Sequence, residues 1–130
     1  MTARSGSRPL ATDNPMRRGE IRLVDLEPVR GSEADKQRPA VIVSNDGANQ
    51  VAQRLGRGVV TVVPVTTNTE RVYPFQVLLP ASETGLAADS KAQAEQVRSV
   101  AVERVGPRVG RMTSDLQGDL DEALRLHLSL

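Results

Sequence analysis

The sequence predicts a mainly β fold of the α+β class, a small antiparallel barrel with short helices attached. Short runs of β-branched residues, separated by Gly, Pro and polar residues, recur between residues 19 and 109, whereas helical patterns are confined to two segments. These strand and helix patterns do not alternate, which disfavours a parallel βαβ sheet. The chain has 130 residues and no cysteine, enough for one domain that buries about two thirds of its unfolded surface without a disulfide.

The first predicted strands follow a polar leader. Residues 1–15 contain two prolines and no apolar period, so we expect a disordered leader there and one folded domain over residues 16–130. Segment 19–26 is short and rich in apolar residues, which is typical of a strand. Segment 39–45 is nearly continuous in β-branched residues, as in a strand buried on both faces. Between these strands, segment 31–38 is polar and predicts a loop.

A short helix and another strand are expected next. Segment 46–55 is rich in Ala and Gln, with Asp46 as the expected N-cap and Gly56 as the expected stop. Segment 58–65 is a further β-branched run. Pro64 near its end predicts a bulge or a sheet edge, because proline cannot donate a hydrogen bond to a neighbouring strand.

The remaining elements are shorter strands and a C-terminal helix. Segment 73–79 predicts a strand, and segments 92–102 and 105–109 carry fainter strand patterns. Ser114 and Gln117 have the spacing of a capping box, which predicts the start of a helix. The residues that would share its apolar face are Leu116, Leu120, Ala123, Leu124 and His127. We expect His127 to be a packed residue at the helix end rather than a ligand or a base.

Composition restricts the chemistry available to the chain. Without cysteine and with a single histidine, thiol nucleophiles, Cys/His zinc sites and Ser–His–Asp triads lack their usual residues. No apolar run approaches the roughly 18 residues of a membrane span, and the first residues lack the apolar core of a secretory signal. Tyr73 and Phe75 are the only aromatic residues, too few for an extended base-stacking platform.

The charge distribution gives a modest indication of an anionic ligand. The net charge is +1, but residues 16–111 carry three excess positive charges and residues 112–130 three excess negative charges. Fifteen of the 17 basic residues are arginine, whose planar guanidinium suits bidentate contacts to phosphate. A coding bias toward arginine explains this composition equally well.

Three polar segments hold candidate functional residues. In segment 31–39, Arg38 directly precedes a buried strand, where we expect a fixed, partly desolvated guanidinium that suits a phosphate. In segment 66–69, threonine hydroxyls and an asparagine amide follow a strand end and suit phosphate oxygens or base edges. From spacing alone, a solvated hairpin loop explains the first and an ordinary turn explains the second. Segment 93–98 predicts a strand with one polar face, either solvated or a groove wall.

Five segments follow one another in a distinctive order and spacing. They are GEI at 19–21 with DL at 25–26, GSE at 31–33 with RPAVIVSND at 38–46, VVPVTTN at 62–68, PF at 74–75 and AEQVRS at 94–99. Together they resemble the MazF/PemK family of toxin endoribonucleases, and the resemblance extends over residues 16–128.

This resemblance implies an SH3-like barrel of the CcdB/PemK type that forms a homodimer. From the missing secretory signal and the RNA substrate, we expect the protein to act in the cytoplasm. It implies the toxin of a type II toxin–antitoxin system, which cleaves single-stranded RNA at short preferred sequences and needs no metal or other cofactor. The RNA 2′-hydroxyl attacks the adjacent phosphate, leaving 2′,3′-cyclic phosphate and 5′-hydroxyl ends. A cognate MazE-like antitoxin neutralises the toxin by placing a disordered tail in the RNA groove.

The resemblance also implies roles for single residues. Arg38 matches the catalytic arginine of the family and Thr66 its catalytic threonine. We expect Arg38 to stabilise the charge that develops on the phosphate and Thr66 to donate a hydrogen bond to a non-bridging oxygen. The residues that fall in groove-lining segments, and are expected to bind substrate, are Ser32, Glu33, Thr67, Glu95 and Gln96.

One departure and two alternatives accompany this resemblance. Relatives often carry Trp or Tyr where this chain has Arg22, so we expect an altered sequence preference and altered stacking in the groove. A CcdB-like gyrase poison on the same barrel is one alternative, but such proteins end in Trp-Gly-Ile and this chain has no tryptophan. The other is a non-catalytic relative that binds only RNA or antitoxin, which the presence of Arg38 and Thr66 disfavours.

Overall fold

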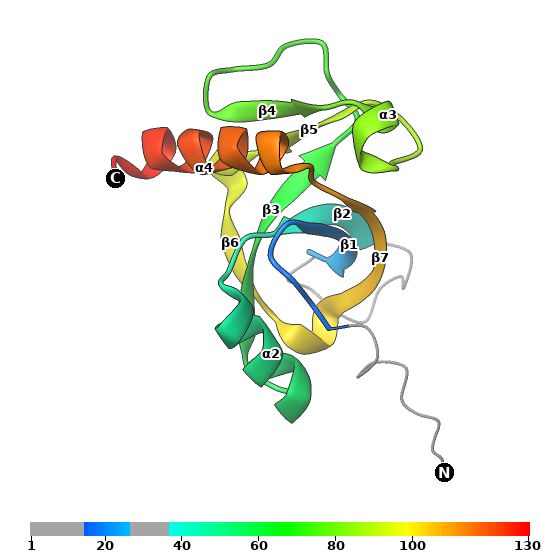
Figure 1. The fold of residues 1–130 in the computed structure, drawn as a ribbon, viewed down its shortest axis with the longest axis vertical. Helices are drawn as coiled ribbons and strands as arrows, with labels where there is room; N and C mark the ends of the chain where they lie inside the picture. The colour runs from blue at the N-terminus through cyan, green and yellow to red at the C-terminus, as the bar shows by residue number, and fades with distance from the viewer. Residues whose placement is uncertain (1–14, 27–36) are drawn as a thin grey trace.

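The computed structural model describes residues 15–26 and 37–130, which form one bent antiparallel sheet with helices packed against it (Figure 1). The predicted leader, apart from its last residue, and most of the predicted loop 31–38 lie outside the described residues. The described strands are β1 (Glu20–Asp25), β2 (Gln37–Ile42), β3 (Val59–Thr66), β4 (Gln76–Leu79), β5 (Ser90–Gln93), β6 (Arg98–Ala101) and β7 (Val105–Arg111). The described helices are α2 (Asp46–Leu55), α3 (Ala81–Thr84) and α4 (Ser114–Leu128), with 3-10 turns η1 (Ala94–Gln96) and η2 (Val102–Arg104). The predicted mainly β, antiparallel fold class is confirmed.

Strand β3 connects the two halves of the sheet. The strands run in the order β4-β5-β3-β2-β1-β7, with β6 paired to β3 beside this path. Residues 59–62 of β3 pair with β6, and Val65 and Thr66 pair with β5. Pro64 lies between these two stretches, where β3 changes partner. The sequence predicts a bulge or an edge at Pro64, and the change of partner also suits a residue without a backbone N–H.

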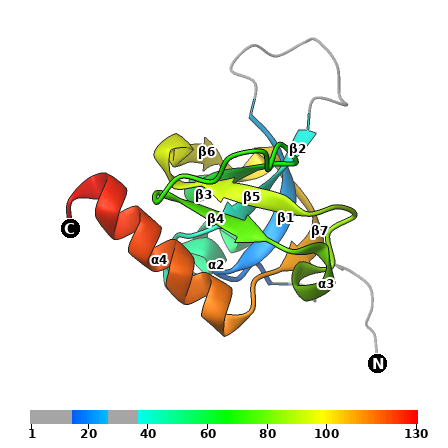
Figure 2. The same cartoon turned by 90° about the horizontal axis from the view of Figure 1, so that it is seen from above.

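Two clusters of buried side chains stabilise the sheet. The first lies between the sheet and α4, which contributes Leu116, Leu120 and Ala123. The second lies within the curve of the sheet and includes Val24 of β1 and Ala52 of α2. In both views of the ribbon, β4 lies between α4 and the loop 67–75 (Figures 1 and 2). Helix α4 therefore covers one face of β4, and the β3–β4 loop lies on its other side.

The N-caps of α2 and α4 each lie one residue before the predicted one. Asn45 Oδ1 and Thr113 Oγ1 each accept the backbone N–H three residues further on, at 2.8 and 3.1 Å. The predictions of Asp46 and Ser114 as caps are therefore wrong. Both positions of each pair carry a residue type that can cap, so propensity alone does not choose between them. Gly56 ends α2 as predicted, in the left-handed conformation with φ of 71°.

The prediction of a packed His127 is also wrong. The buried residues of α4 are confined to its first ten positions, and every residue from 125 to 130 is exposed. The last turn of α4 extends beyond the sheet (Figure 1). His127 has the helical phase of the apolar face, but there is no sheet beneath it to pack against.

The second half of the sheet is more interrupted than the sequence predicts. Strand β4 begins at Gln76, not at residue 73, because a turn precedes it in which the Gln76 N–H donates to the Tyr73 carbonyl at 2.8 Å. The predicted strand 92–102 is broken by η1 into β5 and β6. Strand β7 continues past the predicted end at residue 109 to Arg111. The single turn α3 was not expected from the sequence.

Candidate active site

Strand register brings the two predicted catalytic residues together. In the antiparallel pair of β2 and β3, Ala40 is opposite Pro64 and Val41 is opposite Val63. Arg38 lies two residues before Ala40, and Thr66 lies two residues after Pro64, so both side chains are on the same face of the sheet as this pair. Both residues line the same pocket.

This pocket has a volume of about 370 Å³. Its walls combine strand ends with the 3-10 turn η1, which follows β5 and brings Gln96 into the pocket. The lining residues are Leu26, Arg38, Pro64, Val65, Thr66, Gln93, Gln96 and Arg98. Three of the predicted site residues, Arg38, Thr66 and Gln96, are therefore in one pocket.

The chemistry of the pocket suits an anionic ligand. Among the described residues that line it, the charged groups are the guanidiniums of Arg38 and Arg98, and none is a carboxylate. A hydroxyl and two side-chain amides add hydrogen-bonding groups, while Leu26, Pro64 and Val65 provide apolar walls. Two guanidiniums with neutral donors are the groups that proteins use to bind phosphate oxygens.

Thr66 is oriented by a local hydrogen bond. Its Oγ1 accepts the backbone N–H of Asn68 at 3.2 Å, in the turn that follows β3. Because a hydroxyl has one hydrogen and two lone pairs, this bond leaves the hydroxyl hydrogen available to donate to a ligand. Arg38 is exposed, not partly desolvated as expected, and among the described residues none forms an ion pair with it.

Arg98 is a lining residue that the sequence did not single out. Its Nη1 donates to the Leu26 carbonyl at 3.3 Å and its Nε to the Gln96 carbonyl at 3.5 Å. These two bonds hold the guanidinium between the end of β1 and η1. The signal was present in the polar segment 93–98, but that segment predicts a strand, and only the 3-10 turn brings Gln96 and Arg98 to the same pocket.

Glu95 and Thr67 do not line the pocket. Glu95 Oε2 accepts from Gln76 Nε2 at 2.8 Å, and Gln76 Oε1 accepts the Tyr73 N–H at 3.1 Å. The other carboxylate oxygen of Glu95 is buried and has no hydrogen-bond partner among the described residues. Glu95 thus connects η1 to β4 and to the loop before it. Thr67 is exposed beside the pocket.

Ser32 and Glu33, the remaining predicted substrate-binding residues, lie outside the described residues. Their assignment stays a prediction.

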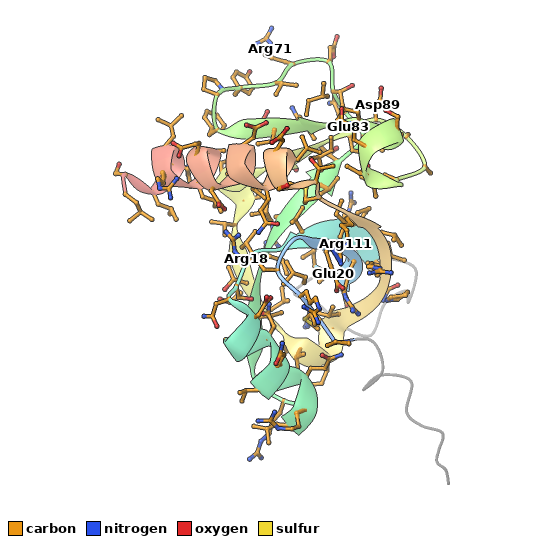
Figure 3. All side chains as sticks on the ribbon, viewed as in Figure 1. Arg18, Glu20, Arg71, Glu83, Asp89 and Arg111 are labelled. Carbon is orange, nitrogen blue, oxygen red and sulfur yellow. The ribbon has the colours of Figure 1, made fainter. Side chains whose placement is uncertain are left out.

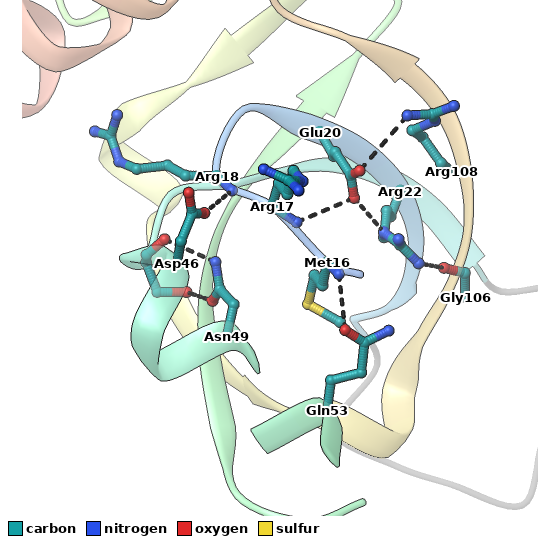
Figure 4. Close-up of polar contacts among 11 residues, drawn as sticks. Met16, Arg17, Arg18, Glu20, Arg22, Asp46, Asn49, Gln53, Gly106 and Arg108 are labelled. Carbon is teal, nitrogen blue, oxygen red and sulfur yellow. Dashed lines mark hydrogen bonds and ion pairs between the residues drawn. The ribbon is translucent and has the colours of Figure 1, made fainter. Parts of the chain in front are cut away.

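Arg22 lies in a buried ion pair away from the pocket. Its Nε donates to Glu20 Oε1 at 2.9 Å and its Nη1 to the Gly106 carbonyl at 3.2 Å (Figure 4). Arg108 Nη1 is 3.6 Å from the other oxygen of Glu20. Figure 3 shows Glu20 inside the ring of β1, β2 and β7, well separated from Arg71 in the loop before β4. The expected effect of Arg22 on stacking in the groove therefore loses its basis.

The described side chains form no cluster suited to a metal ion. Within residues 15–26 and 37–130, no three Asp, Glu or His side chains gather as a metal site would require. No helix in the described part of the chain is long and apolar enough to cross a membrane.

Comparison with known proteins identifies the family. The family described as PemK-like, MazF-like toxin of type II toxin–antitoxin system matches residues 17–128. Endoribonuclease MazF9 of Mycobacterium tuberculosis (strain ATCC 25618 / H37Rv) is 65% identical over 115 residues, which are 88% of this chain and 98% of the relative. Endoribonuclease EndoA of Bacillus subtilis (strain 168) is 28% identical over 116 residues, 88% of this chain and 96% of the relative.

Solved structures have the same fold. An endoribonuclease from Mycobacterial species superposes with a TM-score of 0.68 at 23% identity, covering 90% of this chain and 94% of the other. An endoribonuclease in complex with its cognate antitoxin, also from Mycobacterial species, gives 0.66 at 22% identity, covering 90% and 96%. The described sheet and helices thus have the fold of these endoribonucleases. With the match over residues 17–128, the chain belongs to the PemK-like, MazF-like family of toxins of type II toxin–antitoxin systems.

Proposed function

We propose that this toxin is an endoribonuclease that cleaves single-stranded RNA in the pocket lined by Arg38, Thr66 and Gln96. The observation that supports this most directly is that Arg38 and Thr66 line one pocket, and that the charged groups among its described lining residues are both guanidiniums. RNA supplies its own nucleophile, the 2′-hydroxyl beside the scissile phosphate. The protein must hold this oxygen in line and stabilise the charge that develops on the phosphate.

The two central residues have complementary roles in this reaction. Arg38, exposed at the pocket mouth, pairs with the phosphate and stabilises its added negative charge as the 2′-oxygen attacks. Thr66, whose oxygen already accepts the Asn68 N–H, donates its hydrogen to a non-bridging phosphate oxygen. The products are a 2′,3′-cyclic phosphate and a 5′-hydroxyl, and the reaction needs no cofactor.

The same proposal covers the partners of the toxin. A structural relative is bound to its cognate antitoxin. A MazE-like antitoxin would neutralise this toxin by covering the RNA groove, since an acidic or extended segment there blocks both guanidiniums. We expect the toxin to act as a homodimer in the cytoplasm, where its RNA substrate is found.

The test is cleavage of a long single-stranded RNA by the purified toxin in EDTA, followed by mapping of the new ends. We expect discrete cuts with 5′-hydroxyl ends. Arg38→Ala and Thr66→Val should each lower the single-turnover rate by about 10²- to 10³-fold, the usual cost of removing one donor to a developing oxyanion. Thr66→Ser, which keeps the hydroxyl, should stay within about tenfold of the wild type.

Arg57→Ala is the matched control, because Arg57 is exposed and does not line the pocket. Equal rates for Arg38→Ala and Arg57→Ala would contradict the assignment of Arg38. Intact RNA with folded, antitoxin-free wild type would contradict the nuclease function, and a DNA supercoiling assay would then separate a gyrase poison from a silent binder.

A further inference from the structure

The only two aromatic residues of the chain, Tyr73 and Phe75, stack on each other in the loop between β3 and β4. Their ring centroids are 5.4 Å apart and their planes differ by 3°. Tyr73 is 42% exposed, so its ring is not enclosed in either buried cluster. The sequence has too few aromatic residues for an extended stacking platform, but the structure stacks the exposed Tyr73 ring on the half-buried Phe75 ring.

Two cations border the Tyr73 ring. Arg71 Cζ lies 5.8 Å from the ring centroid, and Arg71 Nη1 donates to the phenolic oxygen at 3.1 Å. Lys91 Nζ lies 6.0 Å from the same centroid and donates to the Arg71 carbonyl at 2.5 Å. These contacts orient the ring and surround it with positive charge, which favours an anionic neighbour.

Lys91 has no acidic counter-charge in the described part of the chain. Its residue is 7% exposed, yet none of the ion pairs among the described residues includes it. A buried ammonium is costly unless it is paired, and one carbonyl with one ring face neutralises it only in part. A phosphate beside the ring would supply the missing negative charge.

This cluster borders the candidate active site. Lys91 is the cross-strand partner of Thr66, so their side chains lie on the same face of the sheet. The Phe75 carbonyl accepts the Ala94 N–H at 3.2 Å, next to Gln93, which lines the pocket. The Tyr73 N–H donates to Gln76 Oε1 at 3.1 Å, which also holds this end of the loop against β4.

We infer that Tyr73, backed by Phe75, and Lys91 form a nucleotide subsite beside the pocket. An unpaired base of the RNA stacks on the ring pair, and a phosphate adjoining that nucleotide pairs with Lys91. The inference rests on the proposed nuclease function and extends it to a nucleotide next to the cleaved bond. Because every base has a π-face, this subsite adds affinity more than it selects a particular base.

The test measures binding of a short RNA that spans the mapped cut site, with a 2′-deoxy nucleotide in place of the one that supplies the attacking hydroxyl. A series of such RNAs each carries one abasic nucleotide. Tyr73→Leu should weaken binding of the fully based RNA by about 5- to 100-fold, the range expected for loss of one stacked base. Removing the base at one position should weaken RNA binding by the wild type by a similar factor. The same abasic RNA should bind Tyr73→Leu as tightly as the fully based RNA does, because the variant has no ring for that base.

Two variants control for changes in the loop itself. Tyr73→Phe keeps the ring and loses only the bond to Arg71, and Val72→Ala alters a neighbouring exposed side chain without touching the stack. Both should bind within about twofold of the wild type. Lys91→Met should make the negative slope of log affinity against log salt shallower by about 0.7, the value for one phosphate contact on a single strand, whereas Tyr73→Leu should leave that slope unchanged.

Several results would overturn the inference. If the wild type cuts RNA but Tyr73→Leu binds it as tightly as the wild type does, the ring pair serves another partner, such as an antitoxin segment, and the nuclease proposal stands. The subsite is also contradicted if Tyr73→Leu weakens the binding of every abasic RNA by the same factor. If Tyr73→Leu does not fold, the wild type alone decides: the subsite is contradicted if no abasic position weakens its RNA binding by about fivefold or more. If the wild type cuts no RNA, the nuclease function and the subsite both fail.

Discussion

At the scale of single residues, Glu20 and Arg22 are both buried, and each neutralises the charge of the other in an ion pair. Glu20 is 2% exposed and Arg22 is 6% exposed. The carboxylate also accepts the Arg17 N–H at 3.3 Å and lies near Arg108, so both of its oxygens have partners. Arg22, which the sequence predicts to alter the substrate groove, is therefore a buried residue of the protein interior.

This arrangement predicts a stability effect without an activity effect. Arg22→Met should lower the free energy of unfolding by about 3 kcal/mol, because it leaves the buried Glu20 carboxylate with only the more distant Arg108 as a counter-charge. The double variant Glu20→Leu/Arg22→Met should lose clearly less than the single variant, since no charge is then left unpaired. Urea denaturation measures both.

Arg17→Met is the control, because Arg17 is exposed and its contact with Glu20 uses the backbone N–H. The RNA cleavage rate of folded Arg22→Met should match that of the wild type. Equal unfolding free energies for Arg22→Met and Arg17→Met would show that the pair contributes nothing to stability.

At the scale of elements, the caps of the helices give a direct test of where each helix begins. Thr113→Ala should destabilise the protein by about 1 kcal/mol, because it removes the acceptor for the Leu116 N–H. Ser114→Ala should change the free energy of unfolding by less than about 0.5 kcal/mol, since Ser114 is the first helical residue and not the cap. Denaturant midpoints of the two variants decide between the observed and the predicted cap.

Some elements were predictable from local pattern, and others depended on partners elsewhere in the chain. The β-branched runs of β2 and β3 are recognisable because buried central strands need continuous apolar residues. The break at η1 is not recognisable, because segment 93–98 has the alternation of a strand and only the pairing of β5 with β4 and of β6 with β3 shows where it is interrupted.

The candidate site was predictable to a similar extent. Arg38 and Thr66 belong to the RPAVIVSND and VVPVTTN motifs, and the pairing of β2 with β3 explains why they line the same pocket. Arg98 and Lys91 carry no distinctive local pattern. Their positions depend on hydrogen bonds to Leu26 and to Arg71, residues 72 and 20 positions away in the chain.

At the scale of the whole molecule, the small net charge limits long-range attraction to RNA. With a net charge of +1, we expect RNA binding to depend on a few local cations and not on a broad basic surface. Three phosphate contacts, from Arg38, Arg98 and Lys91, would give a slope of log affinity against log salt of about −2. Titration of the uncleavable RNA over a range of KCl concentrations measures this slope.

Single substitutions refine that measurement. Arg98→Gln should make the slope shallower by about 0.7, and Arg57→Gln should leave it unchanged. A slope of about −5 or steeper would instead indicate that many more phosphates are contacted, over a surface wider than the pocket.

Helix α4 follows β4 and β5 in the chain and supplies part of the buried cluster that supports them. Every residue that lines the pocket precedes residue 99. A ribosome that has synthesised the pocket residues has therefore not yet synthesised the helix that holds their sheet in place. A message cut upstream of the α4 codons would yield a polypeptide with the pocket side chains but without the helix that supports their sheet, so damage to the toxin's own transcript would limit the amount of folded toxin made.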